Sequence, residues 1–416
     1  MDKFARFTQS QYGTKVTSSD LSGNGLPPVA RRVRFFSESV IREMTRVANK
    51  HGAINLGQGM PDFDPPEEVK EAACRAIRDG VNQYAITWGA PALRQAIAAK
   101  ADQFNGISSD PDTQITVCCG ATECMMATML AVVDPGDEVV IFEPFYENYG
   151  PDALLSGATP VWVRLHPPHW RFDPDELRRA FSPRTKAIIL NTPNNPTGRV
   201  FTREELAQIA DLCREFNVFA LSDEIYEYLR FNGAPHISIA TLPGMADRTV
   251  TISGLSKTFS MTGWRLGYCI APEAISSAIR KAHDFLTVGA PHPLQVAGAV
   301  ALALPASYYS RLEADYHRRR DILVGYLRGA GFDFEAPEGA YYVMTDVARF
   351  ETGLDDTQFV RAMISNVGVS AVPGSSFYAS RDAGRTKVRF MFAKRDETLH
   401  QAGERLLRLR ERFADS

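Results

Sequence analysis

Short runs of apolar residues recur through the middle of the chain, rich in Val and Ile at consecutive positions. A strand with one solvated face alternates apolar and polar residues, whereas a strand that is buried on both faces does not. The pattern therefore predicts the strands of a buried, mostly parallel sheet. These strands are expected at residues 115–119, 138–142, 187–190, 218–221 and 249–252.

Segments before and between these runs carry apolar residues three or four positions apart, which is the spacing of one face of a helix. The helix expected over 202–216 begins with Thr202 and has Glu205 three positions later, as in a capping box. Strands that alternate with helices predict an α/β fold, with a mostly parallel central sheet flanked by helices. The other helices are expected at 40–48, 66–79, 91–103 and 122–133.

The pattern changes after residue 305, where a long charged helix is followed by short strand-like pieces and a C-terminal amphipathic helix. This order of elements predicts a second, smaller α+β domain. Residues 1–28 are polar and rich in Ser, Thr, Gly and Pro, which is typical of a flexible arm. We expect the small domain to comprise residues 29–58 and 306–416, and the large domain to comprise residues 59–305.

Composition and charge exclude several classes of protein. The 416 residues include 46 basic and 49 acidic ones, a net charge of −3, so no basic field is available for nucleic acid or an anionic membrane. The six cysteines form no C-x-x-C pair, and the first residues contain no long apolar run, so a cytoplasmic protein with reduced thiols is expected. The longest mostly apolar stretch, 294–304, is too short to span a bilayer.

In an open parallel sheet, ligands bind outside the carboxyl ends of the strands. Four predicted strands end in side chains that are capable of chemistry. Taken singly, these features also fit a helix cap, a turn, a solvated acid and a surface lysine. A helix start with free N–H groups can equally hold a phosphate. The features are the turn Gly120-Ala121-Thr122, the loop NTPNNPTG with Asn195, Asp223, and Lys257.

Three other kinds of site are excluded by the spelling of the sequence. Lys257 does not belong to a nucleotide-binding P-loop, because Ser256 stands where that motif requires glycine. The Gly-Gln-Gly of residues 57–59 lacks the third glycine of a dinucleotide fingerprint. His166 and His169 flank two prolines with no third ligand nearby, so no metal is expected.

The string SGLSKTFSMTGWRLGY, residues 253–268, resembles the pyridoxal-phosphate lysine signature of class I aminotransferases, with Arg265 eight positions after Lys257. The resemblance extends over about residues 30–400. Within the family, the sequence is similar in particular to the aspartate, aromatic and kynurenine aminotransferases. The resemblance implies a fold-type I architecture and pyridoxal 5'-phosphate as cofactor. Five further segments occur in the family's order: NLGQGMPDF, NQYAITWGAPALR, NNPTG, SDEIYEYL and KVRFMFA.

The resemblance also implies roles for residues around the cofactor ring. Lys257 would form the Schiff base and then act as general base, while Asp223 would pair with the pyridine nitrogen. Asn195 and Tyr226 match the partners of the phenolic oxygen, and Tyr146 matches the aromatic side chain that stacks on the ring. The resemblance therefore implies three catalytic residues, Lys257, Asp223 and Tyr226.

A second group of residues is implied at the phosphate and at the substrate. The backbone of Gly120, Ala121 and Thr122 and the guanidinium of Arg265 would bind the phosphate. By the same resemblance, Tyr84 would reach the phosphate of a neighbouring subunit, which implies a homodimer with a shared active site. The substrate carboxylate would be bound by Arg389, Asn195 and the backbone of Gly57.

One position departs from several members of the family. Gly254 stands three residues before Lys257, where those members carry a serine that contacts the phosphate. That contact is lost here unless Ser253 or Ser256 replaces it.

The expected function is transfer of the amino group of an L-amino acid, such as aspartate or an aromatic amino acid, to a 2-oxo acid, with 2-oxoglutarate as acceptor, in two ping-pong half-reactions. A β-lyase or decarboxylase on the same scaffold is an alternative, because these activities share most cofactor contacts. A non-catalytic ligand-binding or regulatory protein is an alternative from another class. The intact Lys257, Asp223 and Arg389 argue against the latter.

Overall fold

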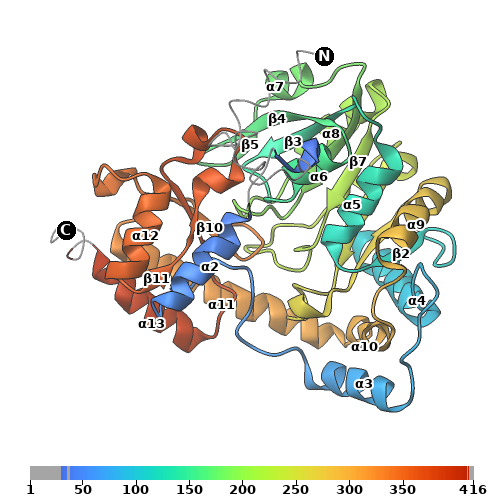
Figure 1. Ribbon diagram of the computed structural model, residues 1–416, viewed down its shortest axis with the longest axis horizontal. Coiled ribbons are helices and arrows are strands. Elements are labelled where there is room, and N and C mark those ends of the chain that lie inside the picture. Colours follow the sequence, from blue (N-terminus) through green and yellow to red (C-terminus); the bar gives the residue numbers. More distant parts are fainter. Residues whose placement is uncertain (1–29, 35–37, 410, 412–416) are drawn as a thin grey trace, which may run out of the picture.

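A computed structural model of the chain describes residues 30–34, 38–409 and 411 (Figure 1). The arm expected at residues 1–28 lies outside the described residues. An eight-stranded sheet with helices on both faces forms the larger part, so the predicted α/β class is confirmed. Across the sheet the strands follow the order β2 (Ile115–Cys118), β9 (Gly267–Ile270), β8 (Thr249–Gly254), β7 (Phe219–Asp223), β6 (Thr185–Asn191), β3 (Glu138–Glu143), β4 (Thr159–His166) and β5 (Arg171–Phe172).

The centre of the sheet is parallel, and each of the five predicted strands is present. β9 was not predicted, and it lies antiparallel between β2 and β8. Only residues 255–266 connect β8 to β9, and they contain no α-helix, so the chain returns beside β8 without the crossover that a parallel strand needs. β4 and β5 were also missed by the sequence pattern.

The apolar runs supply both faces of the sheet, because successive side chains of a strand point in opposite directions. Val140 and Ile188 pack with α8 (Arg203–Glu215) on one face, whereas Ile141 and Ile189 pack with α5 (Ala121–Val132) and α9 (Glu273–Thr287) on the other. α8 begins with the predicted capping box between Thr202 and Glu205.

Further helices surround the sheet. The helix predicted over 91–103 ends earlier, at Lys100, and continues as a π-helical turn, η3, to Asn105. The remaining helices of this part are α3 (Glu67–Arg78), α4 (Pro91–Lys100), η3 (Ala101–Asn105), α6 (Tyr149–Leu155), α7 (Pro174–Arg179) and α10 (His292–Leu302). Short helical turns lie at η2 (Arg31–Arg34), η4 (Ile239–Thr241), η5 (Ala246–Arg248), η6 (Thr262–Trp264), η7 (Ala348–Phe350), η8 (Gly374–Phe377) and η9 (Arg381–Gly384).

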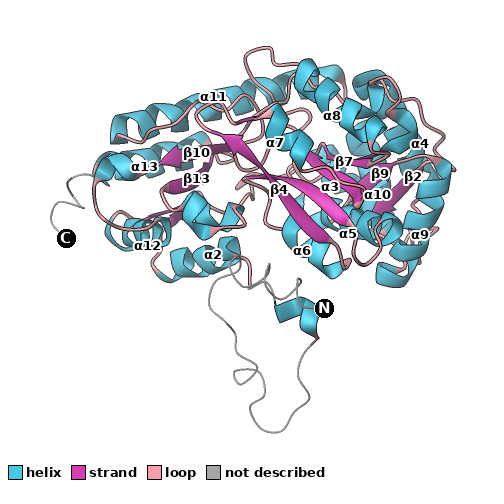
Figure 2. Ribbon diagram, turned by 90° about the horizontal axis from the view of Figure 1, so that it is seen from above, coloured by secondary structure: helices cyan, strands magenta, loops and turns pink. Residues whose placement is uncertain are grey.

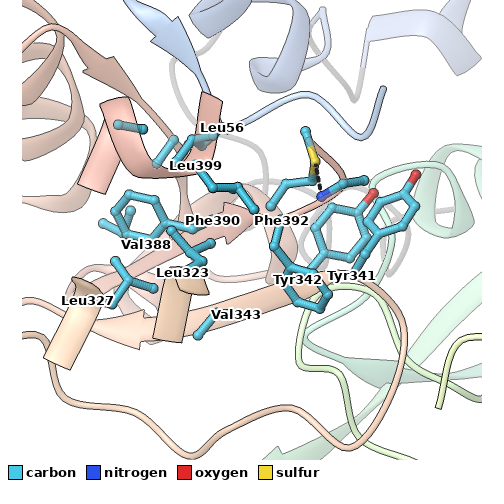
Figure 3. Packing of buried hydrophobic residues seen from close by; sticks show 14 of the residues in the cluster. Leu56, Leu323, Leu327, Tyr341, Tyr342, Val343, Val388, Phe390, Phe392 and Leu399 are labelled. Atoms are coloured by element: carbon cyan, nitrogen blue, oxygen red, sulfur yellow. Dashed lines mark hydrogen bonds between the residues drawn. The ribbon is translucent and has the colours of Figure 1, made fainter. Parts of the chain in front are cut away.

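The C-terminal part packs around a second core, to which the early helix α2 (Val40–Lys50) contributes beside α12 (Figure 1). The long helix α11 runs beside α13 (Figure 2). Figure 3 shows Leu323 and Leu327 of α11 beside Val343 of β10 and Phe390 of β13. The elements are α11 (Ala306–Ala330), α12 (Asp356–Asn366), α13 (Asp396–Leu407), the antiparallel sheet β10 (Tyr342–Asp346), β13 (Lys387–Met391) and β12 (Val372–Pro373), and the pair β1 (Ile54–Asn55) and β11 (Val369–Ser370).

The division into a small domain of residues 29–58 and 306–416 and a large domain of residues 59–305 stays a prediction. Leu229 and Phe231, in the segment after β7, share the core of the C-terminal part, so the two parts pack against each other. Among the described helices, none combines the length and the apolar character needed to cross a membrane.

Candidate active site

The carboxyl ends of the parallel strands border a cavity of about 360 Å³. β6, β7 and β8 each contribute to it at the point where the strand ends, as the topology of an open sheet requires. Of the residues proposed from the sequence, the cavity brings together Ala121, Thr122, Tyr146, Asn195, Asp223, Tyr226, Lys257, Arg265 and Arg389.

Three proposed residues lie elsewhere. Gly120 stands directly before α5 and contacts Arg265 rather than the open space. Gly57 borders Arg389 through its carbonyl oxygen. Tyr84 is 81% exposed and is not among the residues that line the cavity of this single chain.

The side chain of Lys257 reaches into the cavity from the turn after β8. Its Nζ donates one long hydrogen bond of 3.3 Å, to the carbonyl of Gly59, and lies over the rings of Tyr226 and Tyr341. Burial lowers the pKa of this ammonium from its ordinary value. Lys257 therefore has more of the neutral amine, the form that reacts with carbonyl groups and accepts protons, than a surface lysine has.

Asp223 is the buried last residue of β7. Its carboxylate accepts hydrogen bonds from Tyr149 Oη at 2.7 Å and from the N–H of Ile225 at 3.2 Å. Burial raises its pKa to about 6, against the hydrogen bond from Tyr149 and the charge of Lys257, which lower it. At neutral pH the site thus holds a buried carboxylate that a cationic ligand group would stabilise.

Asp152, on α6, is a second buried acid that the sequence analysis missed. It lines the cavity, and its Oδ2 has no hydrogen-bond partner among the described residues. Burial, together with the charge of Asp223, raises its pKa to about 8. Asp152 is therefore protonated at neutral pH.

Replacing Asp152 by Asn is expected to stabilise the cofactor-free protein, and more so as the pH rises. The folded wild-type protein holds this proton up to about pH 8, whereas the unfolded chain loses it near pH 4, so wild-type stability falls between those values. The gain in the free energy of unfolding should reach about 3–5 kcal/mol above pH 8. Calorimetric melting at pH 5 and pH 8.5 measures it, with Asp102→Asn at an exposed site as control. Equal effects at both pH values would contradict the assignment.

The start of α5 and Arg265 form a cradle for an anion. Gly120 has φ +89°, and a Cβ atom there would collide with the guanidinium of Arg265, so glycine is required. Arg265 itself has φ +57°, a strained conformation for a non-glycine residue, and its hydrogen bonds go only to the carbonyls of Thr262 and Cys119. Its charge and the first N–H groups of the helix thus meet at the same edge of the cavity.

Arg389 is a fully buried arginine that forms no ion pair with a carboxylate of the described residues. It lies on β13, the central strand of the small antiparallel sheet. Nη1 donates to Oδ1 of Asn195 and Nη2 to the carbonyl of Gly57, each at 2.7 Å, while Nε has no partner among the described residues. A buried guanidinium with neutral acceptors only is suited to binding an anionic ligand group.

The N–H of Gly57 has a partner of its own. It donates to Oδ1 of Asn55 at 2.8 Å, so the carbonyl is the group that faces Arg389. A direct contact between Gly57 and a substrate carboxylate stays a prediction.

Tyrosine side chains close the cavity around these charges. Tyr226 and Tyr342 share a hydrogen bond between their hydroxyls at 3.2 Å, and burial raises the pKa of Tyr146 to about 12. Tyr342 was missed from the sequence. Tyr149 lies three positions after Tyr146, at the start of α6, and its hydrogen bond to Asp223 was not predicted.

The glycine that departs from several relatives is explained by packing. A Cβ at Gly254 would lie 2.8 Å from the carbonyl oxygen of Leu266, across the β8–β9 pair. Ser253 donates its hydroxyl to Glu227, whereas Ser256 lines the cavity. Of the two serines, Ser256 is therefore the one placed to replace the missing contact.

Two groups outside the cavity have metal-ligand spacing among the described residues: Cys118 with Glu123 and His283, and Glu224 with Glu227 and His236. Lys100 pairs with Glu227 at 2.5 Å, so this carboxylate already has a cation. The absence of a metal stays a prediction.

Comparison with known proteins gives a consistent family. A profile of the family described as Aminotransferase class I and II matches residues 51–406. Methionine aminotransferase of Escherichia coli (strain K12) is 39% identical over 389 residues, which cover 94% of this chain and 100% of that protein. Kynurenine--oxoglutarate transaminase 1 of Homo sapiens is 36% identical over 409 residues, covering 91% of this chain and 97% of that protein.

Solved structures agree with the sequence matches. The structure of N-succinyldiaminopimelate aminotransferase from Mycobacterium tuberculosis matches with a TM-score of 0.88 at 41% identity, covering 92% of this chain and 100% of that one. An aspartate aminotransferase from Thermus thermophilus, with maleate, matches with a TM-score of 0.85 at 34% identity, covering 92% of this chain and 100% of that one. The fold thus agrees with the same group of proteins.

Proposed function

This chain belongs to the class I and II aminotransferase family and is a pyridoxal-phosphate-dependent aminotransferase, and on this premise we propose how its residues share the reaction. One observation carries the proposal: a single cavity holds the buried amine of Lys257, the buried acid Asp223 and the buried guanidinium of Arg389. The relatives named above are aminotransferases or transaminases, so the lyase, decarboxylase and non-catalytic alternatives are not supported.

The residues of the cavity fit pyridoxal phosphate. The cradle at Gly120, which a Cβ would fill, and the guanidinium of Arg265 would hold the phosphate together with the N–H groups of Ala121 and Thr122. Lys257 would hold the cofactor covalently through Nζ. When bound, the cofactor supplies an electron sink for the electrons released at the substrate's α-carbon.

Lys257 and Asp223 would share the proton chemistry. Nζ of Lys257 would take the proton from the donor's α-carbon in one half-reaction and would give a proton to the α-carbon of the former 2-oxo acid in the other, a task for which its lowered pKa is suited. Asp223 would provide a negative charge for the ring nitrogen, and the hydroxyl of Tyr149 orients that carboxylate.

Three uncharged side chains would orient the cofactor ring. Tyr226 and Asn195 would donate hydrogen bonds to its phenolic oxygen, and Tyr146 would cover one face. The hydrogen bond between Tyr226 and Tyr342 fixes the direction of the Tyr226 hydroxyl. Tyr226 therefore acts from a position that the C-terminal part of the chain helps to set.

Arg389 would bind the α-carboxylate that every amino acid and 2-oxo acid carries. Its planar guanidinium can form two parallel hydrogen bonds to a carboxylate, and Asn195 and Gly57 hold it in place through neutral oxygens. A common clamp of this kind lets one site serve both half-reactions.

We propose an L-amino acid such as aspartate or an aromatic amino acid as donor and 2-oxoglutarate as acceptor. The printed names of the relatives include methionine and kynurenine as substrates of those proteins. Incubating the purified holoenzyme with each common L-amino acid and 2-oxoglutarate tests this, with multiple turnovers of glutamate formation expected. Release of pyruvate and ammonia without consumption of the 2-oxo acid would contradict transamination.

We propose a homodimer with a shared active site from an exposed apolar patch. The patch joins the loop of Tyr84 and Ile86 to the end of α9, where Phe285 is 92% exposed. A hydrogen bond from His283 of α9 to the carbonyl of Thr87 holds the two segments side by side, and His292 at the start of α10 donates to the carbonyl of Gln83 in the same loop. Large contiguous apolar patches on a protein surface mark interaction sites.

Phe285→Asp is expected to weaken the dimer by at least 10-fold in dissociation constant, because a charge would be buried in an apolar interface. Sedimentation velocity over a dilution series measures this. Leu407→Asp, at an exposed leucine of α13 outside the patch, is the matched control. A dimer that is equally stable in both variants would remove this patch from the interface.

We propose a cytoplasmic enzyme whose partners, besides a second copy of the chain, are small molecules, not nucleic acid or a membrane. All six cysteines are free thiols, four of them buried, as in proteins of a reducing compartment. The net charge of −3 offers no basic field for nucleic acid. Fractionation of cells with an antibody against the protein tests the location.

A further inference from the structure

A second cavity, of about 600 Å³, lies outside the active site. It opens where the end of α4, the π-helical turn η3, the loop after α10 and the start of α11 come together (Figure 1). Its volume is in the range of small-molecule sites. No described residue of this cavity lines the active-site cavity.

Three stacked aromatic rings form one wall of this second cavity. The ring of Tyr228 stacks on Phe104 with centroids 4.0 Å apart and on Tyr309 with centroids 4.5 Å apart. Phe104 is in the lining because the helix continues as a π-helical turn past Lys100, a deviation often found at functional sites. Leu302 and Leu304 add an apolar wall.

Arg230 supplies a cation that has no anionic partner. Its guanidinium lies over the ring of Phe104 at 5.3 Å, its Nε is buried without a hydrogen-bond partner, and no described carboxylate forms an ion pair with it. A half-buried guanidinium beside an aromatic ring is an effective site for a carboxylate.

The other charges of the cavity define what the ligand must carry. Lys100 is neutralised by Glu227 at 2.5 Å. Glu313, on α11, lines the cavity and has no ion pair with any described residue. The remaining charges are thus one cation and one anion, which complement a zwitterion.

We propose that this cavity is a binding site for a free L-amino acid with an aromatic side chain, separate from the active site. Arg230 binds its carboxylate, Glu313 binds its ammonium group, and the ring packs against Tyr309, Leu302 and Leu304.

Such a ligand would lie close to the segments that carry the reaction. Tyr308, next to Tyr309, donates its hydroxyl to the carbonyl of Thr258 at 2.7 Å, and Thr258 follows Lys257. Tyr228 lies two positions after Tyr226, and Glu227 between them binds Ser253 of β8. The lining residues Tyr309 and Tyr228 are thus direct chain neighbours of residues that hydrogen-bond to the segment around Lys257.

Calorimetric titration with L-phenylalanine tests the site in holoenzyme whose cofactor has been reduced onto the protein with borohydride. Arg230→Met is expected to weaken one binding event at least 10-fold. Arg328→Met is the matched control, because Arg328 also lies over a phenylalanine ring but outside the cavity. The same event should persist in Arg389→Leu, which separates it from binding in the active site and from the proposed function.

The ligand's two charges are tested with analogues. 3-Phenylpropionate lacks the ammonium group and 2-phenylethylamine lacks the carboxylate, so each should bind at least 10-fold more weakly than L-phenylalanine. Arg230→Lys, which keeps the charge, should recover part of the affinity. Equal affinity in Arg230→Met and Arg328→Met, or loss of all binding in a folded Arg389→Leu protein, would overturn the proposal.

Discussion

Lys257→Ala is expected to lower the rate of transamination by more than roughly 10⁴-fold, because the variant loses both the covalent hold on the cofactor and the proton carrier. The purified variant should also lose the yellow colour of the wild-type protein. Steady-state rates with donor and 2-oxo acid, together with absorbance spectra, measure the two effects.

A matched control for Lys257 is available in the same chain. Lys394 is also buried, its pKa is also lowered by burial, and its Nζ donates to the carbonyl of Met60 at 2.9 Å, but it does not line the cavity. Lys394→Ala should therefore keep the colour and most of the activity. Borohydride reduction followed by mass spectrometry should place the adduct on Lys257, and an adduct on another lysine would refute the assignment.

Arg389→Ala is expected to lower kcat/KM by a factor that corresponds to about 2–5 kcal/mol, because the substrate carboxylate would lose a buried charged partner. The loss should be similar for every donor, since the α-carboxylate is common to all of them. Kinetics with two donors and with 2-oxoglutarate measure it. Arg389→Lys should recover part of the loss in kcat/KM, because a lysine keeps the positive charge but cannot form the two parallel hydrogen bonds of a guanidinium to a carboxylate.

The variant Arg320→Ala serves as a control that separates a loss of substrate binding from a general loss of stability. Arg320 is another buried arginine, on α11, and it binds Asp321 and the carbonyl of Pro337 away from the cavity. Arg320→Ala should lower the melting temperature and leave kcat/KM close to that of the wild type. Equal losses of kcat/KM in the two alanine variants would remove Arg389 from the substrate site.

The strands inside the large sheet were predictable from the sequence, because a strand that is buried on both faces is apolar at consecutive positions. Apolar runs such as 187–190 carry no alternation, and the strands that they predict are present as β2, β3, β6, β7 and β8. The capping box of Thr202 is equally local, since its two hydrogen bonds join residues three positions apart. The chemistry at the strand ends followed from the topology of parallel sheets.

β9 and the supporting acids were not predictable in this way. Whether the segment 267–270 runs parallel or antiparallel depends on the length of its connection and on its neighbours, not on its own four residues. In the sequence, Asp152 looks like any acidic residue of a helix. Its pKa is raised only because packing removes water from it and places Asp223 nearby.

Taken alone, the sequence determined the strands of the central sheet, the chemistry at their ends and, through its motifs, the family, since each of these depends on neighbouring residues or on a fixed spelling. Only the tertiary structure decided which distant side chains meet. Arg389 joins Asn195 across 194 positions, and Tyr149 joins Asp223 across 74. Such contacts, and the loss of water that shifts the pKa values of Lys257 and Asp223, exist only once the chain has packed.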